Sequence, residues 1–175
     1  GVGIAAVQVA RLRGAVAVAT ASRPEKLAAL ASFGAVAVNY RQDDVAAAAR
    51  AACPDGVDVV LDLAGADHAA TSIAALRPRG RIVHISSGSA PAIGLPLRDL
   101  MAKEAQVTGG LLRPQPLARK AAFAERLRAE LLPEIGRGIR PLVDTVFPLE
   151  DAAEAHRRIE SRAAIGKVVL VPGAG

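Results

Sequence analysis

Residues 57–62 read Val-Asp-Val-Val-Leu-Asp, and residues 81–86 read Arg-Ile-Val-His-Ile-Ser after the turn Pro78-Arg-Gly80. Each run is short, apolar and rich in valine or isoleucine, which predicts a strand, and residues 67–76 between them have helical spacing. The same alternation occurs upstream, with strands predicted at 15–20 and 36–39 and helices at 4–13, 25–33 and 43–53. Strands that alternate with helices in this way are typical of a parallel sheet covered on both faces. The sequence therefore predicts an α/β fold with a doubly wound parallel sheet.

The regular alternation ends near residue 115. A short helix is predicted at 97–103 and a strand at 106–112, followed by Pro114 and Pro116. Beyond them the pattern predicts a long amphipathic helix at 117–132, an extended segment at 139–147, a helix at 149–162 and a strand at 166–171. We therefore divide the chain into a first unit of residues 1–115 and a second of residues 116–175.

The composition favours a soluble, cytoplasmic protein that binds a small molecule. Hydrophobic residues make up 51% of the chain but aromatic residues only 2%, and no apolar stretch is long enough to cross a bilayer. The single cysteine, Cys53, excludes an internal disulfide and a cysteine-based zinc cluster, so we expect no metal. The net charge of +5 is scattered along the chain, with few aromatic side chains beside it, which makes nucleic acid an unlikely partner. A small phosphorylated ligand suits this charge better.

The first residues, Gly1-Val2-Gly3, run directly into a predicted helix. Unpaired N–H groups at a helix N-terminus attract anions, and dinucleotide-binding folds place the pyrophosphate there. Residues 1–6 match the pattern G-x-G-x-x-A, but this pattern has meaning only when a strand precedes it. The alternative is a frayed terminus with two incidental glycines.

The tip of the strand predicted at 15–20 lacks an acidic residue. A fold that binds NAD normally has Asp or Glu there for the ribose hydroxyls, whereas one that binds NADP omits the acid and supplies cations. Residues 20–26 read Thr-Ala-Ser-Arg-Pro-Glu-Lys, so Ser22, Arg23 and Lys26 could surround a phosphate. The alternative is that Arg23 and Lys26 are simply the solvated start of a helix.

Other strand ends carry small or polar residues. Tyr40 follows the strand at 36–39, where it could flank an adenine or cap the sheet, and Asp62 is expected to cap the turn that follows it. His68, His84 and His156 lie on separate elements and are interpreted as structural. The serines show no G-x-S-x-G pattern, so nothing supports acyl transfer, and we assign no catalytic residue.

Taken together, the motifs resemble the zinc-free medium-chain dehydrogenase/reductases of the quinone oxidoreductase, or zeta-crystallin-like, type. Residues 1–10 resemble the end of that family's glycine-rich loop and its following helix with a recurrent glutamine. Matching pieces follow in the same order and spacing along the chain at 22–26, 38–41, 56–62, 80–83, 147–156 and 165–169. The resemblance covers essentially the whole chain.

This resemblance implies NADPH as the cofactor and assigns residues to its parts. It implies pyrophosphate contact at Gly1 and Val2, and contact with the 2′-phosphate at Ser22 and Lys26 with Tyr40 beside them. Contacts nearer the nicotinamide would come from Ser87, Leu112 and Arg113. The segment after residue 115 would complete a GroES-like domain whose main part precedes residue 1, together with the first strand of the Rossmann-type sheet.

The sequence thus predicts an NADPH-dependent oxidoreductase that transfers hydride to a quinone or an α,β-unsaturated carbonyl, with this chain as its cofactor-binding half. We expect the isolated chain to be inactive and the full-length protein to be a homodimer. One alternative is a SAM-dependent methyltransferase, because residues 57–62 and 76–83 also resemble later strands of that fold. Another is a non-catalytic nucleotide- or RNA-binding module, since a fold does not determine a function.

Overall fold

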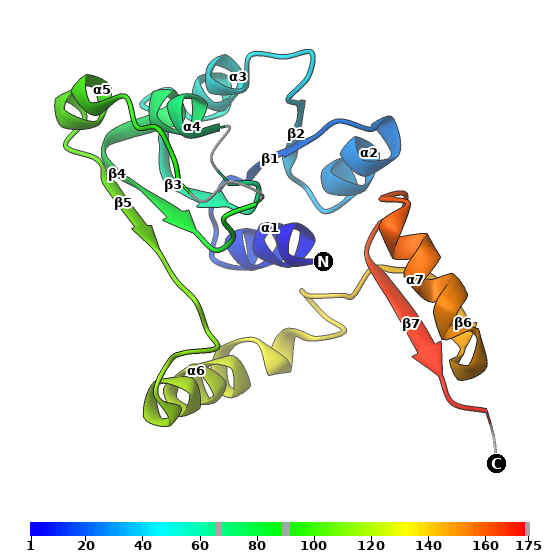
Figure 1. Cartoon of the computed structure of the whole chain (residues 1–175). Coiled ribbons are helices and arrows are strands. Elements are labelled where there is room, and N and C mark those ends of the chain that lie inside the picture. Colours follow the sequence, from blue (N-terminus) through cyan, green and yellow to red (C-terminus); the bar gives the residue numbers. More distant parts are fainter. Residues whose placement is uncertain (66–67, 89–91, 174–175) are drawn as a thin grey trace.

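The structure is a computed structural model that describes residues 1–65, 68–88 and 92–173. Its helices and strands alternate through the first two thirds of the chain (Figure 1). In order, they are α1 (Val2–Leu12), β1 (Val18–Ala21), α2 (Pro24–Ser32), β2 (Val36–Asn39), α3 (Val45–Ala52), β3 (Val57–Asp62), α4 (Ala69–Ala75), β4 (Leu76–His84), α5 (Leu97–Ala102), β5 (Gln106–Gly109), α6 (Leu117–Glu130), η2 (Leu132–Glu134), β6 (Val143–Pro148), η3 (Leu149–Asp151), α7 (Ala152–Glu160) and β7 (Lys167–Val171).

All paired strands in the described residues run parallel, which confirms the predicted class. β3, β4 and β5 form one sheet in that order, and β1 pairs with β2 in another. A third parallel pair joins β6 and β7. Within the described residues no ladder joins β1 to β3, so the first five strands form two parallel sheets.

The helices form layers around these strands. α3 packs against α4, and α4 against α5, so these three helices make one layer, seen along the upper part of Figure 1. α1 and α2 contribute to a different part of the core, because Val7 of α1 and Leu30 of α2 lie in the same buried cluster. The crossover helices of a parallel sheet must pack on its faces, which produces this Rossmann-like arrangement.

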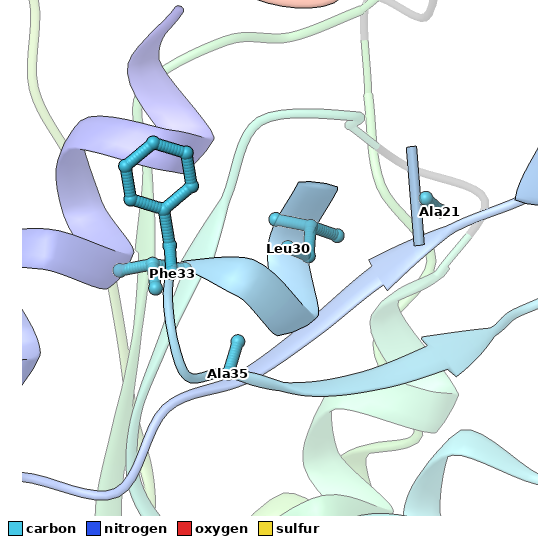
Figure 2. Packing of buried hydrophobic residues seen from close by; sticks show 5 residues of the cluster. Ala21, Leu30, Phe33 and Ala35 are labelled. Carbon is cyan, nitrogen blue, oxygen red and sulfur yellow. The ribbon is translucent and has the colours of Figure 1, made fainter. Parts of the chain in front are cut away.

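The buried core consists of small clusters of aliphatic side chains. In one of them, Leu30 and Phe33 at the end of α2 meet Ala21 of β1 and Ala35 just before β2 (Figure 2). In another, Ile73 of α4 and Leu76 and Ile82 of β4 are all at most 2% exposed. The low aromatic content therefore produces thin, alanine-rich layers in place of one large aromatic core.

Several predicted bounds differ from the structure, and two of the differences have a clear physical reason. The strand expected to reach Leu112 ends at Gly109, because its partner β4 ends at His84 and no further residue of β4 remains to pair. The turn expected at residues 78–80 lies inside β4 as an irregularity, since Val57 pairs with Leu76 and Val59 with Arg81. The first residue of the helix expected at 67–76 lies outside the described residues, and α4 is described from Ala69.

The strands and helix after η2 are held together by contacts with one another. The Asp144 side chain of β6 is 7% exposed and accepts two hydrogen bonds from the Arg158 guanidinium of α7. Helix α7 packs on both strands of the β6–β7 pair. α6 ends at Glu130, two residues before the end of the helix expected at 117–132, and a short 3-10 turn follows at Leu132–Glu134. Pro133 lies within that turn and has no N–H with which to continue the α-helical pattern. The division near residue 115 and the GroES-like assignment remain predictions.

Candidate functional site

The carboxyl ends of β1 and β2 bring the predicted residues Ser22 and Tyr40 to one edge. Ala21 and Asn39 are register partners in this parallel pair, so the residues that follow them leave the sheet side by side. The Tyr40 N–H also donates to the Ala21 carbonyl at 3.2 Å. Two residues far apart in the chain are therefore neighbours at the strand ends, where ligands of open α/β sheets bind.

The charges around Tyr40 are positive. Hydrogen bonding from Ser22, followed by that from Arg41, lowers the pKa of the Tyr40 hydroxyl, and the charges of Arg41 and Lys26 lower it further. Cations nearby favour the anionic form of a phenol. The third predicted residue, Lys26, is thus within electrostatic reach of Tyr40. Arg41 is a residue that sequence reasoning missed, although its place directly after Tyr40 at a strand end could have indicated it.

Lys26 is positioned from α2 by a partner far away in the chain. Its Nζ donates to the backbone carbonyl of Arg162 at 3.0 Å, just after α7. A neutral carbonyl orients the ammonium group without cancelling its charge. Arg23 is exposed, and its backbone carbonyl accepts hydrogen bonds from the N–H groups of Lys26 and Leu27 at the start of α2.

The N-terminal end of α1 lies close to Lys26. Gly1 is the N-cap of α1 and makes no side-chain cap, and Val2 is 56% exposed. A Cβ added to Gly1 would lie 3.5 Å from Nζ of Lys167, the first residue of β7. Lys167 and Lys26 both lie close enough to Gly1 to act on it electrostatically, so both lysines are near the helix end. Lys167 was not singled out from the sequence, because it lies at the far end of the chain.

Another edge is formed where β3 and β4 end. Asp62 Oδ1 accepts from the N–H groups of Ala64 and Gly65, both at 2.8 Å, which confirms that Asp62 caps the turn. His84 Nδ1 lies 3.5 Å from Asp62 Oδ2. The turn then passes so close to the next strand end that a Cβ on Gly65 would lie 2.4 Å from the Ser87 carbonyl oxygen. This packing fixes the position of Ser87, which is exposed.

Leu112 and Arg113 lie on the segment between β5 and α6. Leu112 is 64% exposed, and the Arg113 carbonyl accepts from Lys120 Nζ at 2.8 Å. Within the described residues, no hydrogen bond or ion pair links either residue to Ser22, Lys26 or Tyr40. The structure therefore brings together Gly1, Ser22, Lys26 and Tyr40, with Arg41 and Lys167 added, while Ser87, Leu112 and Arg113 lie at other strand ends.

The histidines lie apart from one another. The His68 ring contacts the Tyr40 ring edge-on, with ring centroids 5.8 Å apart, and His84 Nδ1 lies 3.5 Å from Asp62 Oδ2. Over residues 1–65, 68–88 and 92–173, no three His, Cys, Asp or Glu side chains are grouped so that they could hold a metal ion. In the same ranges, no helix is both long and apolar enough to cross a membrane.

A family model described as zinc-binding dehydrogenase matches residues 33–170. The quinone oxidoreductase of Pseudomonas aeruginosa is 34% identical over 183 residues, which cover 98% of this chain and 54% of that protein. The human synaptic vesicle membrane protein VAT-1 homolog is 31% identical over 99% of this chain and 48% of its own length. The chain thus spans about half the length of the curated relatives it matches.

Solved structures agree with these matches. The quinone oxidoreductase of Thermus thermophilus, determined alone and in complex with NADPH, is 40% identical, with a TM-score of 0.81 over 96% of this chain and 53% of that one. A mycobacterial structure complexed with NADPH is 31% identical, with a TM-score of 0.80 over 98% of this chain and 53% of that one. The chain therefore belongs to the zinc-binding dehydrogenase family, in the medium-chain dehydrogenase/reductase group that includes the quinone oxidoreductases.

Proposed function

We propose that this chain carries the cofactor site of an oxidoreductase that uses NADPH to transfer hydride to a quinone or an α,β-unsaturated carbonyl. The main support is a group of hydroxyl and cationic side chains at the ends of β1 and β2, formed by Ser22, Lys26, Tyr40 and Arg41. The tip of β1 has no acidic residue. A 2′-phosphate there would meet hydroxyl donors and two cations. Similar proteins named quinone oxidoreductases, and similar structures determined in complex with NADPH, support the proposal.

The rest of the cofactor would extend from this group along the strand ends. The pyrophosphate would lie at the N-terminal end of α1, contacting Gly1 and Val2, where unpaired N–H groups and Lys167 supply positive charge. Ser87, Leu112 and Arg113 would lie nearer the nicotinamide. The expected homodimer of the full-length protein is part of the same proposal.

The bound nicotinamide supplies the hydride, while the residues of this chain bind and orient the cofactor. Orientation is a large contribution, because holding two reactants in place can lower a barrier by roughly 7–11 kcal/mol in favourable cases. Within the described residues, no group of His, Cys, Asp or Glu side chains could hold the zinc ion of the family's name. We therefore assign no step to zinc, and we assign no general acid or base to this chain.

Titration of NADPH and NADH against the full chain and Lys26→Ala tests the proposal. A hydrogen bond to a charged group contributes about 1.5–3 kcal/mol, and Lys26 is only partly buried, so NADPH binding should weaken roughly tenfold. NADH binding should scarcely change, because NADH has no 2′-phosphate.

Lys120→Ala is the matched control, because Lys120 also donates to a backbone carbonyl, that of Arg113, but lies on α6. It should leave the ratio of NADPH to NADH affinity unchanged. Equal losses for both cofactors in Lys26→Ala would mean that Lys26 serves only to hold the Arg162 segment, and would contradict the phosphate assignment.

A further inference from the structure

A basic cavity lies near the C-terminal ends of α1 and α2. Its volume is about 400 Å³, and its wall includes Arg11 of α1, Phe33 after α2, and Arg137 and Arg140 from the segment before β6. The 11 residues of α1 correspond to about 16 Å of helix, so the cavity lies near the end of that helix opposite Gly1.

Two of the three arginines are held in place by the same residue, Phe33. The Arg140 guanidinium carbon lies 5.1 Å from the centre of the Phe33 ring, and Arg11 Nη1 donates to the Phe33 carbonyl at 2.9 Å. Phe33 itself is only 6% exposed, which makes it a rigid support. The Arg140 backbone is also fixed, since its N–H donates to Gln8 Oε1 and its carbonyl accepts from Gln8 Nε2. Side chains held in this way lose little entropy when they bind a ligand.

The three arginines have no acidic partner in the described part of the chain. By contrast, five other arginines each form an ion pair with a carboxylate: Arg13, Arg77, Arg126, Arg157 and Arg158. An acid close to the cavity wall is Glu134, whose Oε2 lies 3.0 Å from the position of a Cβ added to Gly138. One carboxylate against three guanidinium groups leaves an excess of positive charge.

We propose that this cavity binds a small phosphorylated molecule carrying at least two negative charges. Guanidinium groups present a planar fork of N–H donors that matches phosphate oxygens, and several held at one wall favour a multiply charged anion. The cavity is also larger than a single water or inorganic phosphate requires, given the roughly 30 Å³ that one water occupies. Gln8 and Arg140 also line the neighbouring hollow that contains Gly1 and Lys167, whereas Arg11, Phe33 and Arg137 line only the basic cavity. The proposal does not depend on the cofactor assignment.

The test is calorimetric titration of inorganic pyrophosphate into the full chain at constant ionic strength, with the cofactor site saturated by NADPH and without NADPH. Arg137→Met and Arg140→Met should each weaken pyrophosphate binding at least fivefold. Arg137 makes no side-chain hydrogen bond or ion pair with described residues, so its variant should fold normally. Arg119→Met is the matched control, because Arg119 also stacks on a phenylalanine, Phe123, at 5.6 Å, but on α6.

The site is supported if binding persists with NADPH present, is weakened at least fivefold in Arg137→Met and Arg140→Met, and is kept in Arg119→Met. Equal weakening in all three variants would indicate general attraction to a basic protein and would overturn the proposal. Loss of binding in Lys26→Ala with retention in both cavity variants would place the anion in the cofactor site instead. The absence of measurable pyrophosphate binding would also overturn it.

Discussion

Gln8 and Arg140 are 132 positions apart, yet the Gln8 amide pairs with the Arg140 backbone as a second peptide group would. Arg140 N–H donates to Gln8 Oε1 at 2.8 Å, and Gln8 Nε2 donates to the Arg140 carbonyl at 3.1 Å. Gln8 is 7% exposed, so this pair is shielded from water. One side chain thereby attaches the segment before β6 to the helix whose N-terminus we propose for the cofactor pyrophosphate.

We expect Gln8→Ala to lower the free energy of unfolding by about 1–2 kcal/mol, because a partly buried N–H and carbonyl lose their partners. Urea denaturation of the full chain measures this change. The control is Gln115→Ala, since Gln115 Nε2 donates to a carbonyl only four residues away, that of Leu111. If Gln8→Ala were as stable as the unsubstituted chain, these two hydrogen bonds would not be what holds the segment before β6 against α1.

Ser22→Ala should raise the pKa of Tyr40 towards its ordinary value of 10.0, because Ser22 is the main cause of the lowering. Tyr40 is the only tyrosine and the chain has no tryptophan, so ultraviolet absorbance during a pH titration follows this one group. Ser32→Ala, which removes a hydroxyl bonded within α2, should leave the midpoint unchanged.

The same titration tests the proposed phosphate position. Bound NADP⁺ should raise the Tyr40 midpoint more than bound NAD⁺, because a 2′-phosphate would place negative charge beside the phenolate. Identical midpoints with the two cofactors would count against a 2′-phosphate at Tyr40.

Asp144 should make stability depend on pH in the acid range. Hydrogen bonds from Arg158, then from the Ile165 N–H, then from Thr145 hold the pKa of this carboxyl well below its ordinary 3.8. Because the pKa is lower in the folded state, the stabilisation is complete above about pH 4 and is lost as the pH falls further. Asp144→Asn should therefore lower the melting temperature at neutral pH and flatten the loss of stability below about pH 4.

The control for Asp144 is Asp58→Asn. Asp58 pairs with Arg77 at 2.6 Å, but its side chain is 72% exposed, and exposed pairs contribute little. Its melting temperature should stay close to that of the unsubstituted chain at every pH. An Asp58→Asn loss as large as that of Asp144→Asn would show that burial is not what distinguishes the two pairs.

Gly65→Ala should be strongly destabilising and should displace Ser87. Gly65 has φ +95°, and an added Cβ would lie 2.4 Å from the Ser87 carbonyl oxygen. Gly14 provides the comparison, because it has φ +72° with nothing within 4 Å of an added Cβ. Gly14→Ala should cost only the backbone strain of about 1–3 kcal/mol, and thermal melting should show a clearly larger loss for Gly65→Ala. Equal losses would mean that the close approach to Ser87 is not a constraint.

The sequence alone determined the order and type of the elements, because the spacing of apolar residues along a strand or a helix follows which of its faces is buried. The strand at Val36–Asn39 and that at Val57–Asp62 are observed with the predicted bounds. It also determined the acid-free tip at Ser22 and the turn capped by Asp62, since both depend on residues within a few positions of one another.

Only the tertiary structure decided where strands stop and which distant side chains meet. The strand at Gln106 ends at Gly109 because β4 offers no further partner, a limit set by another part of the chain. Arg41 is brought near Ser22 by the register of β1 and β2, and Lys26 is oriented by Arg162. Arg11 and Arg140 of the basic cavity both contact Phe33. Periodicity is a property of neighbouring residues, whereas these contacts depend on how separate elements pack, so no local pattern encodes them.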